Sequence, residues 1–186
     1  MKVGIVGFGF VGKALFNSLK SSVNTIRIDP VLNTTIKDLV EFKPEIVFIT
    51  VPTPMLDTGK QDISILEECI GGVIKTKALI VIKSTVLPNH LESLKKRKIN
   101  FIYNPEFLRE KHAYEDFINS KLIILGGEEE CAKKVSDFYK THTKCIEKNH
   151  IFTDEITASF VKYSINTFLS NKVIFFNQLK NIFDKS

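Results

Sequence analysis

Three glycines near the start of the chain could hold the phosphates of a dinucleotide. Gly7, Gly9 and Gly12 form the pattern GxGxxG between an apolar run and a segment of helical spacing. The first glycine permits a tight turn, the second lets the backbone approach a pyrophosphate, and the third allows close helix–strand packing. The helix N-terminus then favours the negative charge. The alternative is a glycine turn that binds nothing.

An aspartate follows the second apolar run of the chain. Asp29 ends the run Thr25–Ile28, where an acidic side chain would accept hydrogen bonds from the ribose hydroxyls of the cofactor. This position favours NAD over NADP, although the nearby Arg27 weakens the preference. The alternative is an aspartate that only caps a loop.

Two threonines follow the third and fourth apolar runs. Thr53 lies in Val51–Pro54, a segment that two prolines stiffen, and Thr85 ends the segment Lys83–Thr85. Ligands of open α/β sheets bind at the carboxyl ends of strands, so both hydroxyls could contact a cofactor. Ordinary turn chemistry is the alternative for each.

Two further pairs supply groups suited to oxidation chemistry. Glu106 and Glu110 are four residues apart in NPEFLRE, so a helix would place both on one face, where paired carboxylates can divide binding and general-base roles. Lys162 and Asn166 are also four apart, and they could stabilise and hold the oxygen of a developing alkoxide. The alternatives are a solvated helix start for the first pair and rim residues for the second.

The spacing of apolar residues predicts the elements that position these groups. Short apolar runs alternate with segments of helical spacing, which is typical of the α/β class and predicts a doubly wound, Rossmann-type parallel sheet. The six expected strands are Lys2–Val6, Thr25–Ile28, Ile46–Val51, Leu79–Ile82, Ile99–Tyr103 and Leu122–Leu125. The expected helices run from the glycines to Leu19 and over Ile36–Phe42, Ile63–Lys75, His90–Lys98 and Glu128–Tyr139.

The last part of the chain predicts one long helix. Residues 154–183 contain neither proline nor glycine, and their apolar side chains cover more than one helix face. We therefore divide the chain into a NAD-binding Rossmann domain, residues 1–150, and a helix, residues 151–186, that would lead into a second domain outside this chain. Burial of the apolar faces by that domain or by a second copy is expected, and a homodimer through the helix is the expected assembly.

Composition indicates a globular protein from a reducing compartment. Of 186 residues, 44% are hydrophobic, and the net charge of +5 includes no basic run longer than Lys95–Lys98, which favours a solvated surface over nucleic-acid binding. Cys69, Cys131 and Cys145 are widely spaced and odd in number, which indicates neither a disulfide framework nor a metal site. Neither a signal peptide nor a membrane span is recognisable, so we expect a cytoplasmic protein.

The order of these motifs resembles the NAD-binding half of the UDP-glucose/GDP-mannose dehydrogenase family. The resemblance is carried by GFGFVG, VPTP, KST, NPEFLRE, and Lys162 with Asn166. Members of that family oxidise the C6 alcohol of a nucleotide sugar to a carboxylate by two hydride transfers to two NAD, through a thioester on a cysteine. The resemblance therefore implies a nucleotide-sugar substrate and NAD as the cofactor.

The resemblance also implies a role for each candidate residue. The cofactor would be contacted by Gly7, Gly9, Phe10, Val11, Gly12, Asp29, Thr53, Thr85 and Glu110. The sugar would be contacted by Glu106, Phe107, Leu108, Arg109, Glu110, Lys162 and Asn166. Thr85, Glu106, Lys162 and Asn166 would form the catalytic group, with Glu106 assisting thioester hydrolysis.

Some features depart from the family pattern. Thr34 or a neighbour replaces a basic residue expected shortly after Asp29, and Lys111 stands where a glycine is usual. The family's second domain, with its nucleophilic cysteine, lies outside this sequence, and none of the three cysteines here matches that nucleophile. The chain could work with a separate second-domain chain, or it could be a catalytically silent NAD-binding or assembly module. A dehydrogenase of the 6-phosphogluconate type is a further alternative, which NPEFLRE disfavours.

Overall fold

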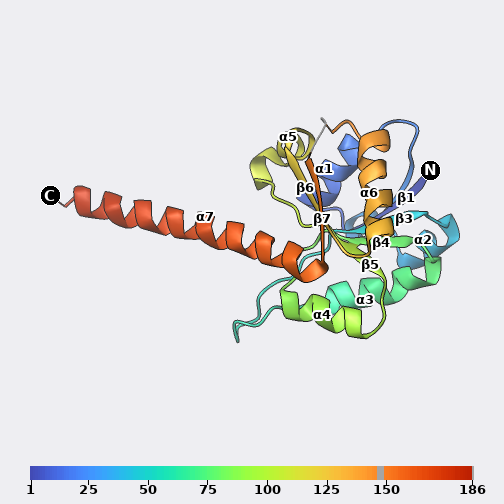
Figure 1. The fold of residues 1–186 in the computed structure, drawn as a ribbon, viewed down its shortest axis with the longest axis horizontal. Helices are drawn as coiled ribbons and strands as arrows, with labels where there is room; N and C mark the ends of the chain where they lie inside the picture. Colours follow the sequence, from blue (N-terminus) through green and yellow to red (C-terminus); the bar gives the residue numbers. More distant parts are fainter. Residues whose placement is uncertain (146–148, 186) are drawn as a thin grey trace.

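The protein, in a computed structural model that describes residues 1–145 and 149–185, folds around one sheet with helices on both faces (Figure 1). Its strand order is β2-β1-β3-β4-β5-β6-β7. The strands are β1 (Lys2–Val6), β2 (Asn24–Ile28), β3 (Ile46–Ile49), β4 (Leu79–Ile82), β5 (Phe101–Tyr103), β6 (Leu122–Gly126) and β7 (Asn149–Thr153). The α-helices are α1 (Phe10–Ser18), α2 (Ile36–Phe42), α3 (Ser64–Val73), α4 (Pro88–Lys96), α5 (Ala113–Asn119), α6 (Glu129–His142) and α7 (Glu155–Phe183). Short 3₁₀ turns are η1 (Pro30–Leu32), η2 (Ile74–Thr76) and η3 (Glu110–His112).

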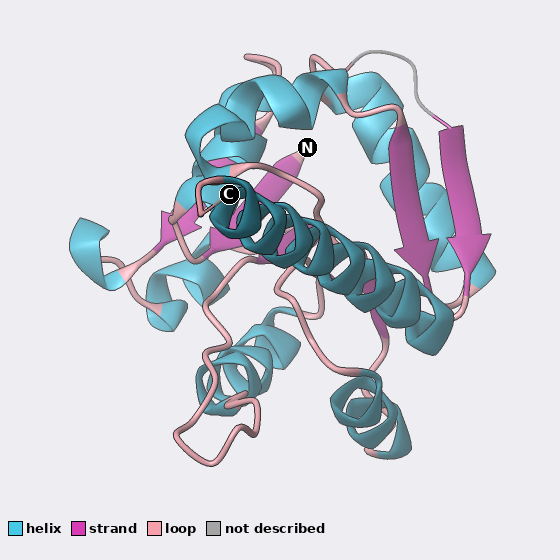
Figure 2. Cartoon of the chain, turned by 90° about the vertical axis from the view of Figure 1, so that its left-hand side faces the viewer, coloured by secondary structure: helices cyan, strands magenta, loops and turns pink. Residues whose placement is uncertain are grey.

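The doubly wound α/β fold is confirmed, but the sheet is not parallel throughout. Strands β1 to β5 are parallel, whereas β5 pairs antiparallel with β6 through Tyr103 and Gly126. The connection between them stays at one edge of the sheet, because it holds only a loop, η3 and the seven-residue α5. Strands β6 and β7 are parallel to each other and lie side by side at the right of Figure 2. The carboxyl ends of β1 to β5 therefore share one edge, and those of β6 and β7 lie at the other.

Two apolar layers hold the helices on the sheet. On one face, Leu39 of α2, Leu66 of α3 and Leu94 of α4 are fully buried against the strands. On the other face, Leu15 of α1 and Phe138 of α6 do the same, together with α5. Figure 1 shows these two helical layers on opposite sides of the sheet. The inner strands β3, β4 and β5 are covered on both faces, so their side chains are apolar without alternation.

Three details of the expected elements are wrong. The sheet has a seventh strand, β7, where six strands were expected, so the last helix begins at Glu155 and Asp154 caps it by accepting from the Thr157 N–H. Helix α5 was not expected. The segment NPEFLRE does not form a helix, because residues 104–109 are a loop and only Glu110 enters η3. Asn104 precedes a proline, a position that disfavours helical backbone.

Helix α7 joins the rest of the molecule only through its first turns. Ala158, Ser159 and Lys162 are buried, whereas each residue from Ser164 to Phe183 is exposed. Figure 1 shows the helix projecting from the body of the fold, and Figure 2 looks along it. Within the described residues, no helix is both long and apolar enough to cross a bilayer.

Candidate active site at the carboxyl ends of the parallel strands

A cleft of about 480 Å³ lies where the parallel strands end. It is lined by the loops that follow β1 to β5 and by Lys162 of α7. A larger hollow of about 950 Å³ lies at the opposite edge, where Lys77 and Lys98 follow the carboxyl ends of η2 and α4. None of the site residues expected from the sequence lines this larger hollow. Most of the site residues expected from the sequence instead line the smaller cleft.

The glycine turn leaves room for a phosphate beside its backbone. Gly7 has a φ of 89°, which favours glycine, and a Cβ at Gly12 would lie 2.3 Å from the carbonyl oxygen of Gly7. A Cβ at Gly9, by contrast, would meet no atom within 4 Å. Gly7 and Gly12 thus make the close packing of α1 possible, while Gly9 presents bare backbone to the cleft, as binding of a dinucleotide requires.

Asp29 lies at the adenosine end that such a cofactor would occupy. Its carboxylate accepts hydrogen bonds from the N–H of Phe8 at 2.6 Å and from the N–H of Val31 at 2.9 Å. Each oxygen keeps further acceptor capacity for a ribose hydroxyl. The guanidinium of Arg27 lies over the rings of Phe16 and Phe8, 4.7 and 5.3 Å from their centroids. Asp29 can therefore cap its loop through these two backbone hydrogen bonds and still accept a hydrogen bond from a ribose.

The strand order sets the order of groups along the cleft. Asp29 follows the edge strand β2, the glycine turn follows β1, and Thr53, Thr85 and Glu106 follow β3, β4 and β5 in turn. Four strand spacings of about 4.8 Å separate β2 from β5, or about 19 Å. An elongated ligand with its adenosine at Asp29 and its pyrophosphate at the glycines would thus bring its other end to Glu106.

At that other end, a buried ion pair fixes Glu106. The ammonium of Lys83 lies 2.7 Å from Oε2 of Glu106, and the Lys83 side chain is only 2% exposed. It also donates to Oδ1 of Asn104 at 3.0 Å and to the hydroxyl of Tyr139 at 3.2 Å. Three donors thus meet three acceptors, which is the condition for burying a lysine charge.

The protonation of this cluster follows from its burial. Burial acts to lower the pKa of Lys83, but the charge of Glu106 and the contact with Tyr139 outweigh it, so that this pKa is raised. Burial raises the pKa of Tyr139 to about 12, despite the opposing charge of Lys83. Lys83 is therefore charged and Tyr139 neutral at pH 7. Lys83 is a site residue that the sequence analysis missed, although a lysine directly after an apolar strand was a signal for it.

Lys162 approaches the same end of the cleft from α7. Its ammonium donates to the backbone carbonyl of Glu106 and lies 5.0 Å from the centroid of the Phe107 ring. Its pKa is lowered, chiefly by burial and further by Lys83, while Glu106 opposes the shift. The structure thus brings the expected Glu106 and Lys162 together, with Lys162 poised to give up a proton more readily than an exposed lysine.

The cleft includes most, but not all, of the expected residues. Its lining contains Gly7, Gly9, Phe10, Val11, Asp29, Thr53, Thr85, Glu106, Leu108 and Lys162. Gly12 is buried beneath the turn. Glu110 and Asn166 are exposed and do not line the described cleft, and Phe107 packs against the core.

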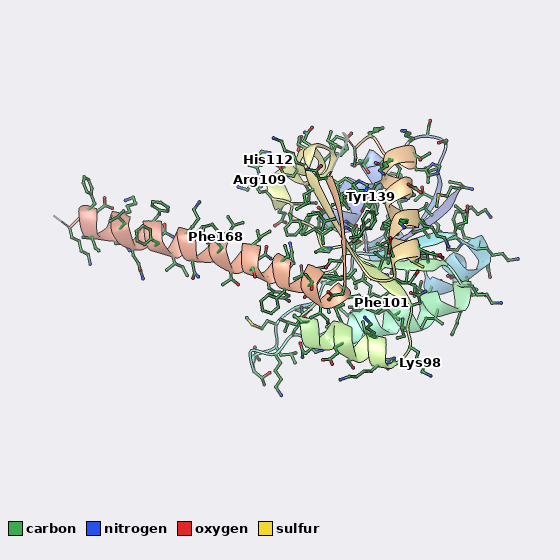
Figure 3. All side chains as sticks on the ribbon, viewed as in Figure 1. Lys98, Phe101, Arg109, His112, Tyr139 and Phe168 are labelled. Atoms are coloured by element: carbon green, nitrogen blue, oxygen red, sulfur yellow. The ribbon has the colours of Figure 1, made fainter. Side chains whose placement is uncertain are left out.

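Arg109 has a partner of its own. Its guanidinium donates to the carboxylate of Asp116 through Nε at 2.9 Å and Nη2 at 2.8 Å. Figure 3 shows Arg109 and His112 beside α5. Arg109 therefore ties the loop to α5, and a substrate role for it would have to use its remaining donors. The roles of Arg109, Glu110 and Asn166 stay predictions.

The three cysteines lie outside the residues that line the cleft. Cys69, Cys131 and Cys145 are free thiols, and none of them is among the residues that line it. In the part of the chain that the structure describes, no group of His, Cys, Asp or Glu side chains could hold a metal ion.

Comparisons with known proteins agree with this geometry. The family described as "UDP-glucose/GDP-mannose dehydrogenase family, NAD binding domain" matches residues 17–143. The chain belongs to this family. The cofactor of this dehydrogenase family domain is NAD, as expected from Asp29 and the glycine turn.

Relatives within the dehydrogenase family are longer than this chain. The UDP-glucose 6-dehydrogenase of Rickettsia bellii is 37% identical over 153 residues, which are 76% of this chain and 35% of the relative. That of Rickettsia felis is 36% identical over 152 residues, covering 76% of this chain and 34% of the relative. The chain thus spans about a third of the length of these curated relatives.

Solved structures of two dehydrogenases share the fold. A UDP-glucose dehydrogenase from Pyrobaculum islandicum has a TM-score of 0.78 at 24% identity, covering 96% of this chain and 52% of that one. A GDP-mannose dehydrogenase from Pseudomonas aeruginosa has a TM-score of 0.79 at 19% identity, covering 95% and 52%. At these identities the likeness establishes the fold alone.

Proposed function

We propose that this chain is the NAD-binding half of an enzyme that oxidises the C6 alcohol of a nucleotide sugar, as a UDP-glucose 6-dehydrogenase does. The observation that carries the proposal is the meeting of Glu106 and Lys162 at one end of a cleft whose other end holds the glycine turn and Asp29. The names of the Rickettsia relatives support the choice of substrate class.

In this proposal the cleft binds NAD along its whole length. Asp29 accepts from the adenosine ribose, Gly9 lets the pyrophosphate approach, and the hydroxyls of Thr53 and Thr85 face the nicotinamide half. NAD, when bound, supplies the acceptor for the hydride that leaves the alcohol carbon. The rest of the chemistry falls to side chains of this chain and to groups outside it.

Lys162 is proposed to accept the proton of the alcohol and to stabilise the charge on its oxygen, and Glu106 is proposed to assist hydrolysis of the thioester. Loss of a hydride requires the hydroxyl proton to leave, and the negative charge that develops on oxygen is stabilised by a nearby ammonium. Burial lowers the pKa of Lys162, so its neutral form is more accessible as a proton acceptor. Asn166 would hold the same oxygen, and Glu110 would join the sugar site from η3.

The outer part of α7, residues 164–183, is proposed to contact a second copy of the chain and a cysteine-bearing second domain. Its exposed rings include Phe168 at 63%, Phe175 at 58% and Phe176 at 59% exposure, which is unusual for a helix without a partner. A second copy packed along this helix would cover them, and a second domain, on a separate chain or beyond this sequence, would bring the cysteine. We also place the protein in the cytoplasm on the basis of its unpaired thiols.

A second candidate function is a catalytically silent NAD-binding or assembly module. The observation that favours it is that none of the three cysteines lines the described cleft, so the thioester route has no nucleophile from this chain. The module would keep the fold and the cofactor, and would act through the exposed helix.

Two measurements test these proposals. Calorimetry with NAD and NADP should show binding of NAD. If neither cofactor gave a binding heat, both proposed functions would be excluded. NADH production from UDP-glucose or GDP-mannose should then be measured with and without a candidate second-domain chain. Turnover only in the mixture supports a split dehydrogenase, turnover by this chain alone supports a self-sufficient one, and no turnover in either favours the silent module.

A further inference from the structure

Gln61 joins three segments that are far apart in the sequence. Its side-chain amide donates to the carbonyl of Thr85 at 2.8 Å and to the hydroxyl of Tyr163 at 3.2 Å. Its Oε1 accepts from the N–H of Leu87 at 2.9 Å. One amide thus holds both ends of the loop 85–87 after β4 and links that loop to the first turns of α7.

Other side chains hold the same loop at single points. Thr53 donates its hydroxyl to the carbonyl of Thr85 at 2.6 Å, so that this carbonyl accepts two hydrogen bonds. The N–H of Val86 donates to the Tyr103 hydroxyl at 3.3 Å, and its carbonyl accepts from Ser159 Oγ at 2.6 Å. Among the described contacts, Gln61 is the side chain that bonds both ends of the loop.

The loop that Gln61 holds forms part of the cleft wall at the end opposite Asp29. Thr85 lines the cleft beside Lys83 and Ser84, after β4, whereas Asp29 follows the edge strand β2. Peptide units are planar, so fixing the carbonyl of Thr85 and the N–H of Leu87 restricts the backbone between them. Gln61 is thus one of two side chains that hold the Thr85 carbonyl, and it also holds the N–H of Leu87.

We propose that Gln61 is a positioning residue for the nicotinamide half of NAD. This inference rests on the proposed function, which places the nicotinamide over β3 and β4. Gln61 does not itself line the cleft; it acts by holding Thr85 in place. It also stands at the base of the hairpin 54–62, where Gln61 forms a bridge with Met55.

The Gln61 amide lies outside the two apolar layers that hold the helices on the sheet. Gln61 is half-buried and belongs to neither apolar cluster of the body. The amide makes three hydrogen bonds, and none of them lies within a helix or between paired strands. Loss of the amide should therefore leave a folded body in which the loop 85–87 is less well fixed. Only ligands that contact this loop should then bind more weakly.

The test separates the two halves of the cofactor. NADH is titrated by its fluorescence, and ADP-ribose, which lacks the nicotinamide, is titrated by calorimetry, on the whole chain and its Q61L and Q61E variants. We expect Q61L to weaken NADH about tenfold and ADP-ribose less than twofold. Q61E keeps the acceptor for Leu87 but sets a carboxylate oxygen against the Thr85 carbonyl, so it should weaken NADH at least as much as Q61L does. Y163F, which leaves both loop contacts in place, is the matched control and should bind both ligands normally.

The other outcomes overturn the inference in distinguishable ways. Equal weakening of NADH and ADP-ribose in Q61L would show a general structural role, and unchanged NADH binding would show that Thr85 does not depend on Gln61. If the unaltered chain bound neither ligand, the NAD-binding function would fail first and the inference with it. Melting temperatures identify a misfolded Q61L, in which case Q61E decides by the same comparison.

Discussion

The body of the molecule buries phenylalanine side chains in its core, whereas the outer part of α7 exposes its own. In the body, Phe138 is 2% exposed and packs 5.1 Å from Phe48, measured between ring centroids. In the outer helix, residues 164–183, Phe168 is 63% exposed and lies on the part of the helix that projects from the body in Figure 3. The body completes its own core, whereas the outer helix carries apolar surface whose burial requires another molecule or domain.

Charges show the same difference between the two regions. Lys83 in the body is buried with three hydrogen-bonding partners, whereas Lys172 in the outer helix is exposed and lies 5.6 Å from the centroid of the Phe168 ring. A buried charge depends on its partners for its stability, while an exposed one is solvated by water. Substitutions of equal chemistry should therefore have very different effects in the two regions.

The largest contrast is expected from truncating phenylalanines. Phe138→Ala should lower the free energy of unfolding by about 3–5 kcal/mol, because it leaves a cavity in the packed layer. Phe168→Ala should change it by less than about 0.5 kcal/mol in the monomer, because water already surrounds most of that ring. Urea unfolding at low protein concentration measures both. Similar losses from the two variants would show that the outer helix is already covered in solution.

A second contrast concerns lysines. Lys83→Met should cost about 3 kcal/mol of stability, because it leaves Glu106 without its buried counter-charge. The matched Lys172→Met should be nearly neutral. The double variant Lys83→Met/Glu106→Leu should recover part of the loss, since it removes the stranded charge as well. Urea unfolding that finds Lys83→Met as harmless as Lys172→Met would argue against the ion pair.

A third contrast separates chemistry from cofactor binding. Lys162→Ala should lower nucleotide-sugar oxidation about 100-fold, roughly the effect of losing a group that stabilises the transition-state charge. NAD affinity should change less than about twofold, because Lys162 belongs to the sugar side of the cleft. NADH production in the presence of the second-domain chain and calorimetry with NAD supply the two readouts, with Lys172→Ala as control. An equal fall in both would move Lys162 to the cofactor site.

The smallest effect is expected from the pair of the exposed Arg109 and the half-buried Asp116 at the rim of the body. Hydrogen bonds from Arg109 lower the pKa of Asp116 from 3.8 to about 2. Because the folded-state pKa lies below the ordinary value, the stabilisation is complete above about pH 4 and is lost as the pH falls towards 2. Arg109 is 74% exposed, so solvent screening keeps the loss of stability small. Asp116→Asn should abolish this part of the acid dependence in urea unfolding, and an unchanged profile would contradict it.

Most strands of the body could be predicted because their signal is local. The ranges expected for β1 and β4, and for α2, agree with the structure at both ends, and the long helix begins one residue after Asp154. Such runs are apolar, β-branched and bounded by turn residues, so their own composition is sufficient. The glycine turn was also predictable, since Gly7 must adopt positive φ and Gly12 must pack closely.

The missed elements lack such a local signal. Strand β7 has the sequence NHIFT, in which no residue is fully buried, so its pairing with β6 supplies what its composition does not. The reversed direction of β6 follows from a connection that does not cross the sheet, which apolar spacing cannot reveal. The loop conformation of NPEFLRE depends on Pro105 and on the hydrogen bond from Asn104 to the carbonyl of Ile124.

For the candidate site, the sequence alone determined the glycine turn, the acidic residue after β2 and the presence of a carboxylate and a lysine in later segments. Only the tertiary structure decided that Glu106 pairs with Lys83, that Lys162 reaches the Glu106 carbonyl, and that Gln61 holds the loop after β4. The physical reason is that the glycine turn is formed largely by residues close in the chain, since Gly12 packs on the carbonyl of Gly7. The energy of a buried charge or amide is instead set by partners from distant segments, which only the folded sheet brings to one edge.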